Sequence, residues 1–299
     1  MLRIWVLLAV VVSGQLFAGQ NDRVPAYLLE VPASVGTVLI AETDTSTLHL
    51  FSNGDGRVGR DRETYMSIGQ NGVGKAREWD GRTPLGVYFI NEQLDTSGLH
   101  EKYGPVAYPL DYPNTWDRKS GRSGDGIWIH GVTPNSGRRP PLDTDGCIAL
   151  PNDELLELGP RLLLHETPVV ITRSIRWTSP QRLESDRIEL RGALDRWVKS
   201  IESGDLHLHL SLYDDEFSYR GMNRDEWAAF RMQSVTRAAP QAIVLQDVLL
   251  MADPEDEGLY LSRFRQAVAY DGRTVATLKR LYWKRSADGI LRIVAEDNG

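Results

Sequence analysis

The strongest constraint on the fold is a change in hydrophobic pattern near residue 176. Before it, over residues 35–173, apolar runs are short and are separated by Gly and Pro. Runs of four to six residues that are rich in Val, Ile, Thr, Tyr and Phe and bounded by turn residues are typical of strands. They read TVLIAE, TLHLFS, TYMSIG, LGVYFI, GIWIHG, CIAL and VVITRS. We therefore expect a mostly-β domain over residues 35–173.

One helix and a polar segment end this half of the chain. Asn152 is placed to cap a helix, acidic residues follow it, and leucines recur at helical spacing at positions 155, 158 and 162. The stretch after Arg176, WTSPQRLES, is polar and contains a proline, which favours a linker. We place this linker at residues 174–182.

The second half, residues 183–299, begins with helices and continues as strands. Apolar residues from Ile188 to Ile201 recur at helical spacing, and Gly204 ends the pattern. A second segment spans residues 206–212, and Asn223 with Glu226 forms a capping box for another helix, with Trp227, Phe230 and Val235 facing inward. Long alternating stretches then predict an antiparallel sheet with one wet face. Helices followed by a curved sheet indicate an α+β cone.

Charge and the amino terminus bear on partners and location. The net charge is −7 and no basic block occurs, which argues against a nucleic-acid partner. Residues 1–18 contain Arg3, an apolar run and small residues, the pattern of a secretory signal peptide, with an uncleaved anchor as the alternative. Residues 19–34 are expected as an N-terminal linker. After cleavage we expect an exported protein without a membrane-spanning segment.

The candidate chemistry centres on the single cysteine, Cys147, and on His130 seventeen residues before it. A thiol is a better nucleophile once a neighbouring imidazole takes its proton. Gly146 permits close backbone approach, so that amides beside the thiol can hold an oxyanion. The alternative is structural, because a lone cysteine is often inert packing and a histidine at a strand end often satisfies a local hydrogen bond.

These residues resemble the motif of the L,D-transpeptidase, or YkuD, catalytic domain, and the resemblance covers about residues 35–173. The motif has a histidine and glycine, then a spacer, then a Ser or Thr, His, Gly, Cys series. The resemblance implies a β-sandwich-like fold with Cys147 as nucleophile, His130 as base, and Gly131, Gly146 and Ile148 as backbone support. The matching positions are His130, Gly131, Thr144, Gly146, Cys147 and Ile148, with Thr83, Pro84 and Gly86 upstream.

Two positions depart from the family motif. Asp145 stands where the family usually has a histidine, and Ala149 stands where a polar residue is frequent. An inward-facing Asp145 would raise the pKa of the thiol or orient an imidazole or a substrate ammonium, whereas an outward-facing one is a turn residue. Thr144 is a further candidate for tuning. Arg138 and Arg139, in the spacer, either pair with stem-peptide carboxylates or are solvated.

Residues 183–299 resemble NTF2-like domains, a fold that carries no fixed activity. With an L,D-transpeptidase domain before it, this arrangement is similar to bacterial cell-shape enzymes that trim peptidoglycan stem peptides. We expect a periplasmic L,D-transpeptidase that forms a cross-link through a Cys thioester on tetrapeptide stems. The alternatives are an L,D-carboxypeptidase that hydrolyses the same thioester and an inactive wall-binding module. The NTF2-like domain is a candidate for dimerisation or for binding a protein partner.

No cofactor and no metal is expected. The sequence contains no HExxH, phosphate-loop or GxSxG motif. His207 and His209 alternate with leucines, but without a third ligand they make a poor zinc site, and solvent exposure is the expectation for both.

Overall fold

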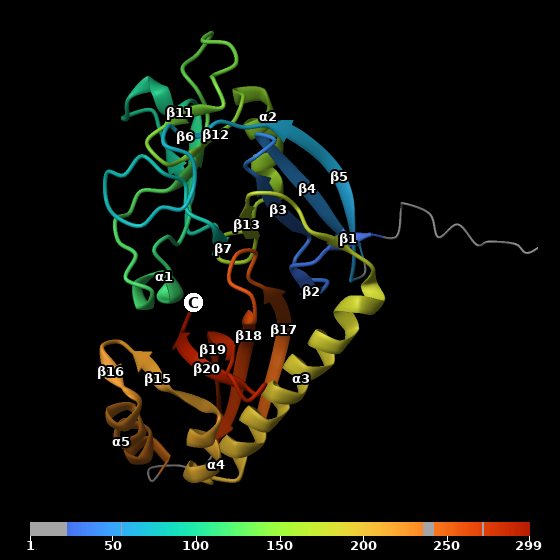
Figure 1. The fold of residues 1–299 in the computed structure, drawn as a ribbon, viewed down its shortest axis with the longest axis vertical. Helices are drawn as coiled ribbons and strands as arrows, with labels where there is room; N and C mark the ends of the chain where they lie inside the picture. Colours follow the sequence, from blue (N-terminus) through green and yellow to red (C-terminus); the bar gives the residue numbers. More distant parts are fainter. Residues whose placement is uncertain (1–22, 55, 236–241, 271) are drawn as a thin grey trace, which may run out of the picture.

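The computed structural model describes residues 23–54, 56–235, 242–270 and 272–299, and it has two β-rich halves (Figure 1). The expected signal peptide, residues 1–18, lies outside the described residues. The first half contains two packed sheets and several short elements. Its strands and helices are β3 (Thr37–Glu42), β4 (Thr47–Gly54), β5 (Arg57–Tyr65), β6 (Ile68–Gly69), β7 (Gly86–Phe89), β8 (Leu94–Asp95), η2 (Glu101–Tyr103), β9 (Val106–Pro109), α1 (Thr115–Lys119), β10 (Trp128–His130), β11 (Leu142–Thr144), β12 (Ile148–Ala149), α2 (Asn152–Leu158), η3 (Gly159–Arg161) and β13 (Pro168–Thr172).

The strands of the first half form a five-stranded sheet, ordered β5-β4-β3-β13-β7, and a four-stranded sheet, ordered β12-β10-β9-β8. Strand β3 shows why the apolar runs become buried strands. Leu39 and Ala41 face a core between the two sheets, whereas Val38 and Ile40 face a second core on the opposite side. Successive strand residues point to opposite faces, so residues 38–41 of this strand are all apolar because both of its faces are covered.

Helix α2 differs from the expectation at its first turn. Asn152 is the first residue of the helix and Pro151 is the residue before it, without a side-chain cap. The Asn152 side chain instead bonds to the backbone of Val132. Leu155, Leu158 and Leu162 are buried in the core between the two sheets, as the spacing indicates.

Within its described residues, the second half contains three helices and six strands of a seven-stranded sheet, ordered β16-β15-β20-β19-β18-β17-β2. The last strand, β2 (Leu28–Glu30), comes from near the start of the chain. The long strands β17 to β20 agree with the sequence pattern. Its elements are α3 (Pro180–Glu202), α4 (Leu206–Ser211), β15 (Tyr213–Tyr219), β16 (Met222–Asn223), α5 (Arg224–Val235), β17 (Ala242–Ala252), β18 (Leu259–Tyr270), β19 (Arg273–Arg285) and β20 (Leu291–Asp297).

The capping box before α5 is present. Asn223 Oδ1 accepts the Glu226 N–H at 3.0 Å, and Glu226 Oε2 accepts the Asn223 N–H at 2.9 Å. Trp227 is buried as expected, but Phe230 on α5 and Ile188 on α3 are exposed, because each helix turns only a narrow face toward the sheet. The side chain of Val235 lies outside the described residues.

Both segments expected as linkers contain strands. Within residues 19–34, β1 (Val24–Pro25) pairs with β14 (Trp177–Thr178), and β2 (Leu28–Glu30) pairs with β17 at the edge of the seven-stranded sheet. Residues 174–182 hold β14 and the first turn of α3. These pairings join segments far apart in sequence, which a local hydrophobic pattern does not reveal.

The two halves share a hydrophobic core. Val38, Ile40 and Phe89 of the first half and Leu249 and Leu261 of the second are buried in one cluster. Polar contacts surround this cluster where the chain terminus reaches α1 (Figure 1). Thr115 Oγ1 donates to Asp297 Oδ2 at 2.6 Å, and Arg280 forms ion pairs with Asp111 and Asp297. The halves therefore pack as one unit.

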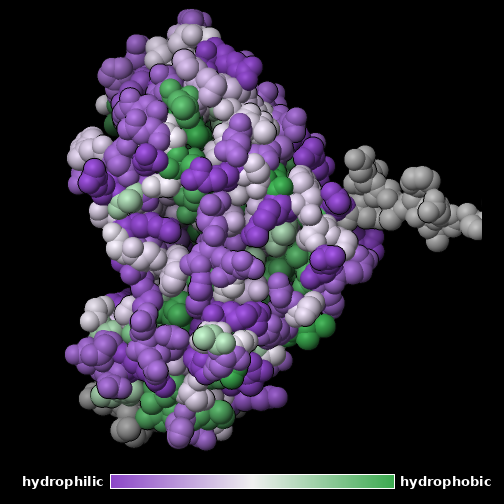
Figure 2. Space-filling view, in the orientation of Figure 1, coloured by the Kyte–Doolittle hydropathy of each residue, from purple (hydrophilic) through white to green (hydrophobic). Residues whose placement is uncertain are grey.

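The surface is mostly hydrophilic on the face shown in Figure 2, with hydrophobic residues in scattered patches. Among the described residues, none of the helices combines the length and the apolar character required of a membrane span.

Candidate active site

Strands β10 and β12 bring His130 and Cys147 to the same side of the four-stranded sheet. The two strands run parallel, with Ile129 beside Ile148 and His130 beside Ala149. This register sets Cys147 beside Trp128, two residues before His130 on the neighbouring strand. Paired residues and residues two apart share one face of a sheet, so the thiol and the imidazole are on one face.

A cavity of about 210 Å³ opens over this face, and both His130 and Cys147 line it. Most of the remaining wall is formed by charged and aromatic side chains. No sequence pattern indicated that Lys75, Lys102, Tyr103 and Trp128 would be among them. The lining residues are Lys75, Glu78, Trp79, Lys102, Tyr103, Asp125, Gly126, Trp128, His130, Arg139, Asp143, Thr144, Asp145 and Cys147.

The imidazole of His130 is oriented by its own neighbour. Nδ1 lies 2.6 Å from the carbonyl oxygen of Gly131, and a carbonyl can only accept, so Nδ1 carries the proton and Nε2 is the basic nitrogen. The ring of Tyr103 meets the imidazole edge-on at 5.2 Å. Burial is the main cause that lowers the pKa of His130 to about 4, and Arg139 and Lys102 lower it further. The imidazole is thus neutral at pH 7.

Asn152 fixes the loop that follows His130. Its Oδ1 accepts the Val132 N–H at 2.8 Å and its Nδ2 donates to the Val132 carbonyl at 3.0 Å. A Cβ at Gly131 would lie 2.3 Å from Asn152 Oδ1 and 2.8 Å from Pro105 Cδ, so this position requires glycine. By accepting the Val132 N–H, Asn152 fixes the peptide unit between Gly131 and Val132, whose carbonyl orients the histidine.

Cys147 is the one cysteine of the chain and is reduced. Its side chain is buried, and Sγ donates to the carbonyl of Gly126 at 3.3 Å. Burial raises the pKa of the thiol to about 11, and the nearby charge of Asp145 also raises it. The resting site accordingly holds a neutral thiol, bonded to the Gly126 carbonyl, and a neutral imidazole in the same cavity.

The backbone around the thiol is tightly fixed. Thr144 Oγ1 donates to the Cys147 carbonyl at 2.7 Å and accepts the Gly146 N–H at 3.1 Å. Gly146 has φ 128°, and a Cβ there would lie 2.6 Å from the Arg82 carbonyl oxygen. Thr144 is thereby a backbone clamp, and Gly146 occupies a position closed to other residues.

The backbone support expected at Gly131, Gly146 and Ile148 takes a different form at each position, and at Gly131 it is the carbonyl that orients His130. The Gly131 N–H donates to the Tyr103 carbonyl at 3.0 Å, and the Gly146 N–H is held by Thr144. Ile148 lies in β12, paired with Ile129. The hydrogen bonds found within the described part of the chain include none from the Cys147 N–H, which leaves it as the free main-chain donor beside the sulfur.

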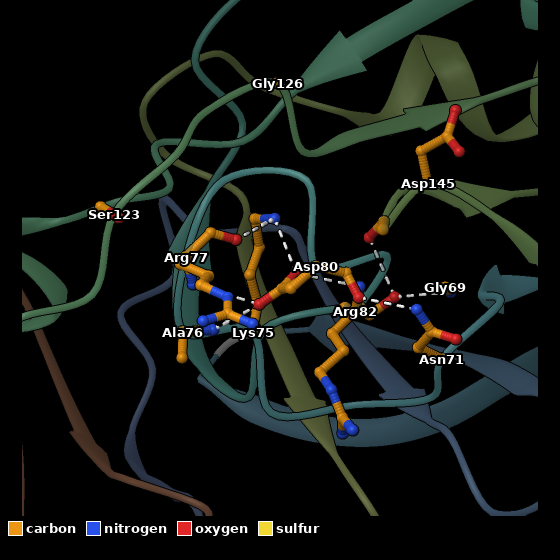
Figure 3. Close-up of polar contacts among 12 residues, drawn as sticks. Gly69, Asn71, Lys75, Ala76, Arg77, Asp80, Arg82, Ser123, Gly126 and Asp145 are labelled. Carbon is orange, nitrogen blue, oxygen red and sulfur yellow. Dashed lines mark hydrogen bonds and ion pairs between the residues drawn. The ribbon is translucent and has the colours of Figure 1, made fainter.

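Asp145 faces outward at the cavity rim. Its carboxylate is largely exposed and pairs with Lys102 Nζ at 3.2 Å. Figure 3 shows it apart from the group around Asp80. Asp145 therefore combines features of both alternatives, because its exposed carboxylate pairs with Lys102 while its charge raises the pKa of the thiol.

The two spacer arginines separate. Arg139 lines the cavity, and its Nε donates to Asp143 Oδ2 at 2.6 Å. Arg138 does not line the cavity and instead stacks on the ring of Tyr65 at 3.5 Å. Only Arg139 remains a candidate for substrate contact.

Asp80 holds together the loop that forms one cavity wall (Figure 3). Its carboxylate accepts the N–H groups of Ala76, Arg77 and Arg82 and bonds to Lys75 Nζ at 3.0 Å. Burial alone would raise its pKa, but these donors outweigh burial and lower the pKa of Asp80 to about 2. The loop is therefore held by a carboxylate that stays ionised at any ordinary pH.

Asp80→Ala should loosen residues 75–82 while the rest of the chain stays folded. Three main-chain donors and a buried ammonium would lose their acceptor. We expect limited trypsin digestion to cut after Arg77 at least about tenfold faster than in the unmodified chain, because cleavage follows local opening. Asp143→Ala, which removes a more exposed ion pair in a different loop, is the control. An unchanged rate in Asp80→Ala would mean that Asp80 does not hold the loop.

A metal site finds no support in the described ranges, where no group of three His, Cys, Asp or Glu side chains is arranged to hold an ion. His207 is exposed, but His209 is buried, contrary to the expectation. Its Nδ1 lies 2.8 Å from Ser200 Oγ, and its ring stacks on Trp227. His209 is therefore part of the packing beneath α4.

Comparisons with protein-family models agree with this geometry. Residues 36–171 match the L,D-transpeptidase catalytic domain, YkuD. Residues 189–297 match the Cds6 C-terminal NTF2-like domain. The prediction of an L,D-transpeptidase domain followed by an NTF2-like domain is confirmed, as is the two-domain fold class.

Two solved structures resemble the L,D-transpeptidase and NTF2-like domains together. Bd1075 from Bdellovibrio bacteriovorus is 24% identical with a TM-score of 0.76, covering 92% of this chain and 98% of that one, and shows the shared fold. The helical cell shape determining protein Pgp2 from Campylobacter jejuni is 27% identical with a TM-score of 0.73, covering 93% and 95%. Comparison with curated protein sequences gives no significant match.

Proposed function

We propose that this chain releases the terminal D-Ala from peptidoglycan tetrapeptide stems through a thioester on Cys147. The L,D-transpeptidase domain supports a role on peptidoglycan. The observation that carries the finer proposal is the shared cavity, which His130 and Cys147 line from neighbouring parallel strands. A nucleophile and a base that face one cavity are what acyl transfer requires.

In this mechanism, Nε2 of His130 takes the Sγ proton of Cys147 as the sulfur attacks the carbonyl carbon before D-Ala. The Cys147 N–H is the candidate donor to the oxyanion. When the tetrahedral intermediate collapses, the C–N bond breaks, and the imidazolium returns the proton to the departing amine of D-Ala. The buried neutral pair suits this order, because charge forms only when substrate has excluded water.

Hydrolysis is the favoured fate of the thioester. The cavity of about 210 Å³ is smaller than the ~300 Å³ lower bound of common ligand sites, so the reacting end of the donor stem occupies most of it. The departure of D-Ala frees space beside the thioester, which water molecules can enter. Water, activated by the now neutral His130, attacks the thioester carbonyl, and the tripeptide carboxylate and the thiol are released. The chain would then act as an L,D-carboxypeptidase.

Cross-linking is the second candidate, and the family of residues 36–171 favours it. Carboxylates of Glu78, Asp125 and Asp143 line the cavity, and they suit an incoming ammonium. Incubation with purified disaccharide tetrapeptide separates the outcomes. Tripeptide monomer with free D-Ala supports hydrolysis, and dimer supports transpeptidation. If no product forms, and a separate incubation with a carbapenem gives no adduct on Cys147, the result supports the binding module.

The acid limb of kcat/KM should lie near pH 4. His130 accepts a proton only when neutral, and its pKa is lowered from 6.5 to about 4 by burial. Activity should therefore be lost as the pH falls through about 4, and the profile should stay flat toward the thiol pKa of about 11. A pH series of initial D-Ala release rates measures this. A limb near pH 6.5 would contradict a buried, neutral base.

The substrate also bears on location and domain roles. We propose export to the periplasm after removal of residues 1–18, since peptidoglycan lies outside the cytoplasmic membrane. We propose residues 35–173 as the catalytic domain, residues 174–182 as the connection and residues 183–299 as the NTF2-like domain. A homodimer or protein partner at the NTF2-like domain stays a prediction, to be measured by light scattering of the full chain.

A further inference from the structure

Trp79 stands out as the most exposed large hydrophobic side chain of the described residues. It is 87% exposed, compared with 61% for Ile188, the next such residue. It also lines the cavity that contains Cys147 and His130. Its backbone has φ 59°, a conformation unfavourable for a bulky residue. An indole is normally buried, so this exposure beside the cavity requires an explanation.

The loop that carries Trp79 is braced on both sides. Asp80, the next residue, bonds to three main-chain N–H groups and to Lys75. From the other side, the Ser123 N–H donates to the Ala76 carbonyl at 3.1 Å, and a Cβ at Gly124 would lie 3.0 Å from Glu78 Cα. The indole is therefore presented on a rigid support, which lowers the entropy cost of binding.

The cavity is too small for the whole substrate, so part of the substrate lies outside it. A cavity of about 210 Å³ holds the reacting end of a stem but not the remainder. A stem peptide carries several carboxylates, which suit the Lys102 and Arg139 side chains and are repelled by Glu78 beside Trp79. The glycan to which the stem is attached is neutral along its ring faces, and a pyranose presents a flat face of C–H groups.

We infer that Trp79 is a stacking platform for a sugar ring of the glycan strand whose stem peptide enters the cavity. This inference rests on the proposed function. The indole face supplies a broad apolar surface, and the C–H face of the sugar ring packs on it. Trp79 makes the enzyme prefer stems attached to sugar over free peptides, and it contributes to binding and not to the chemical step.

The test compares disaccharide tetrapeptide with the free tetrapeptide of the same sequence. In Trp79→Ala, kcat/KM for the disaccharide substrate should fall about tenfold through KM, and at least about five times more than for the free tetrapeptide. Trp79→Phe should restore most of the preference, because a smaller aromatic face remains. Ile188→Ala, which removes an exposed apolar side chain on α3, is the matched control.

Calorimetric binding to the Cys147→Ala chain separates this inference from the proposed reaction. The platform is supported if the disaccharide ligand binds more tightly than the free tetrapeptide and if Trp79→Ala removes this difference. This result counts even where the unmodified chain releases no D-Ala. Equal losses for both ligands would overturn the inference by assigning Trp79 to the peptide. An unchanged affinity for the disaccharide ligand would overturn it as well.

Discussion

Cys147→Ala should abolish the release of D-Ala from tetrapeptide stems while the chain remains folded. The sulfur is the only thiol available, and its loss removes the nucleophile. Removing the nucleophile of a comparable catalytic unit costs about 10⁶-fold in rate. The substitution deletes one buried atom and a single 3.3 Å contact to Gly126, so its effect on stability should be small. Chromatographic assay of D-Ala and tripeptide measures the effect.

The matched comparison is His130→Gln. This variant keeps the thiol but lacks the basic nitrogen, so the rate should fall at least about 10³-fold and should no longer show the acid limb near pH 4. Asp145→Asn should retain activity, because this carboxylate faces solvent and pairs with Lys102. Undiminished D-Ala release by Cys147→Ala would contradict a mechanism that passes through a thioester on Cys147.

Deletion of residues 183–299 should leave an insoluble or unfolded catalytic fragment. The cluster shared by the halves buries large apolar side chains of the second half against β3 and β7. Burying each such side chain contributes about 1.5–3 kcal/mol. Losing four of these side chains would therefore remove as much free energy as the 5–15 kcal/mol net stability typical of a folded protein. The fragment also loses β17, the strand that pairs with β2. Circular dichroism and sedimentation of the fragment measure this outcome.

Point variants on β17 test the same interface in the full chain. Leu249 is fully buried in the shared cluster, whereas Val244 on the same strand is exposed. Leu249→Ala should lower the free energy of unfolding by about 2–5 kcal/mol, and Val244→Ala by less than about 1 kcal/mol. A soluble fragment 23–182 with native circular dichroism and full activity would show that the NTF2-like domain is dispensable for folding.

The sequence predicted the elements whose pattern is local. The run TVLIAE became β3, and the capping box at Asn223 and Glu226 begins α5. The cysteine and the histidine were found because strand ends and turn residues mark them. Their placement on one cavity agrees with the motif.

Elements that depend on distant partners escaped prediction. Strands β1 and β2 are too short to produce a pattern and exist because β14 and β17 pair with them. Asn152 was interpreted as a helix cap, but the approach of Val132 gives its amide better partners. The position of Trp79 depends on the bonds around Asp80, which connect residues that show no periodicity.

The most direct test of the Cys147 thioester is the mass of the chain after reaction with disaccharide tetrapeptide and a rapid acid quench. We expect an adduct equal to the substrate minus D-Ala, located on the peptide that contains Cys147 and absent from Cys147→Ala. Stoichiometric release of D-Ala by a chain whose Cys147 never carries this adduct, at a rate that Cys147→Ala matches, would contradict a thioester mechanism.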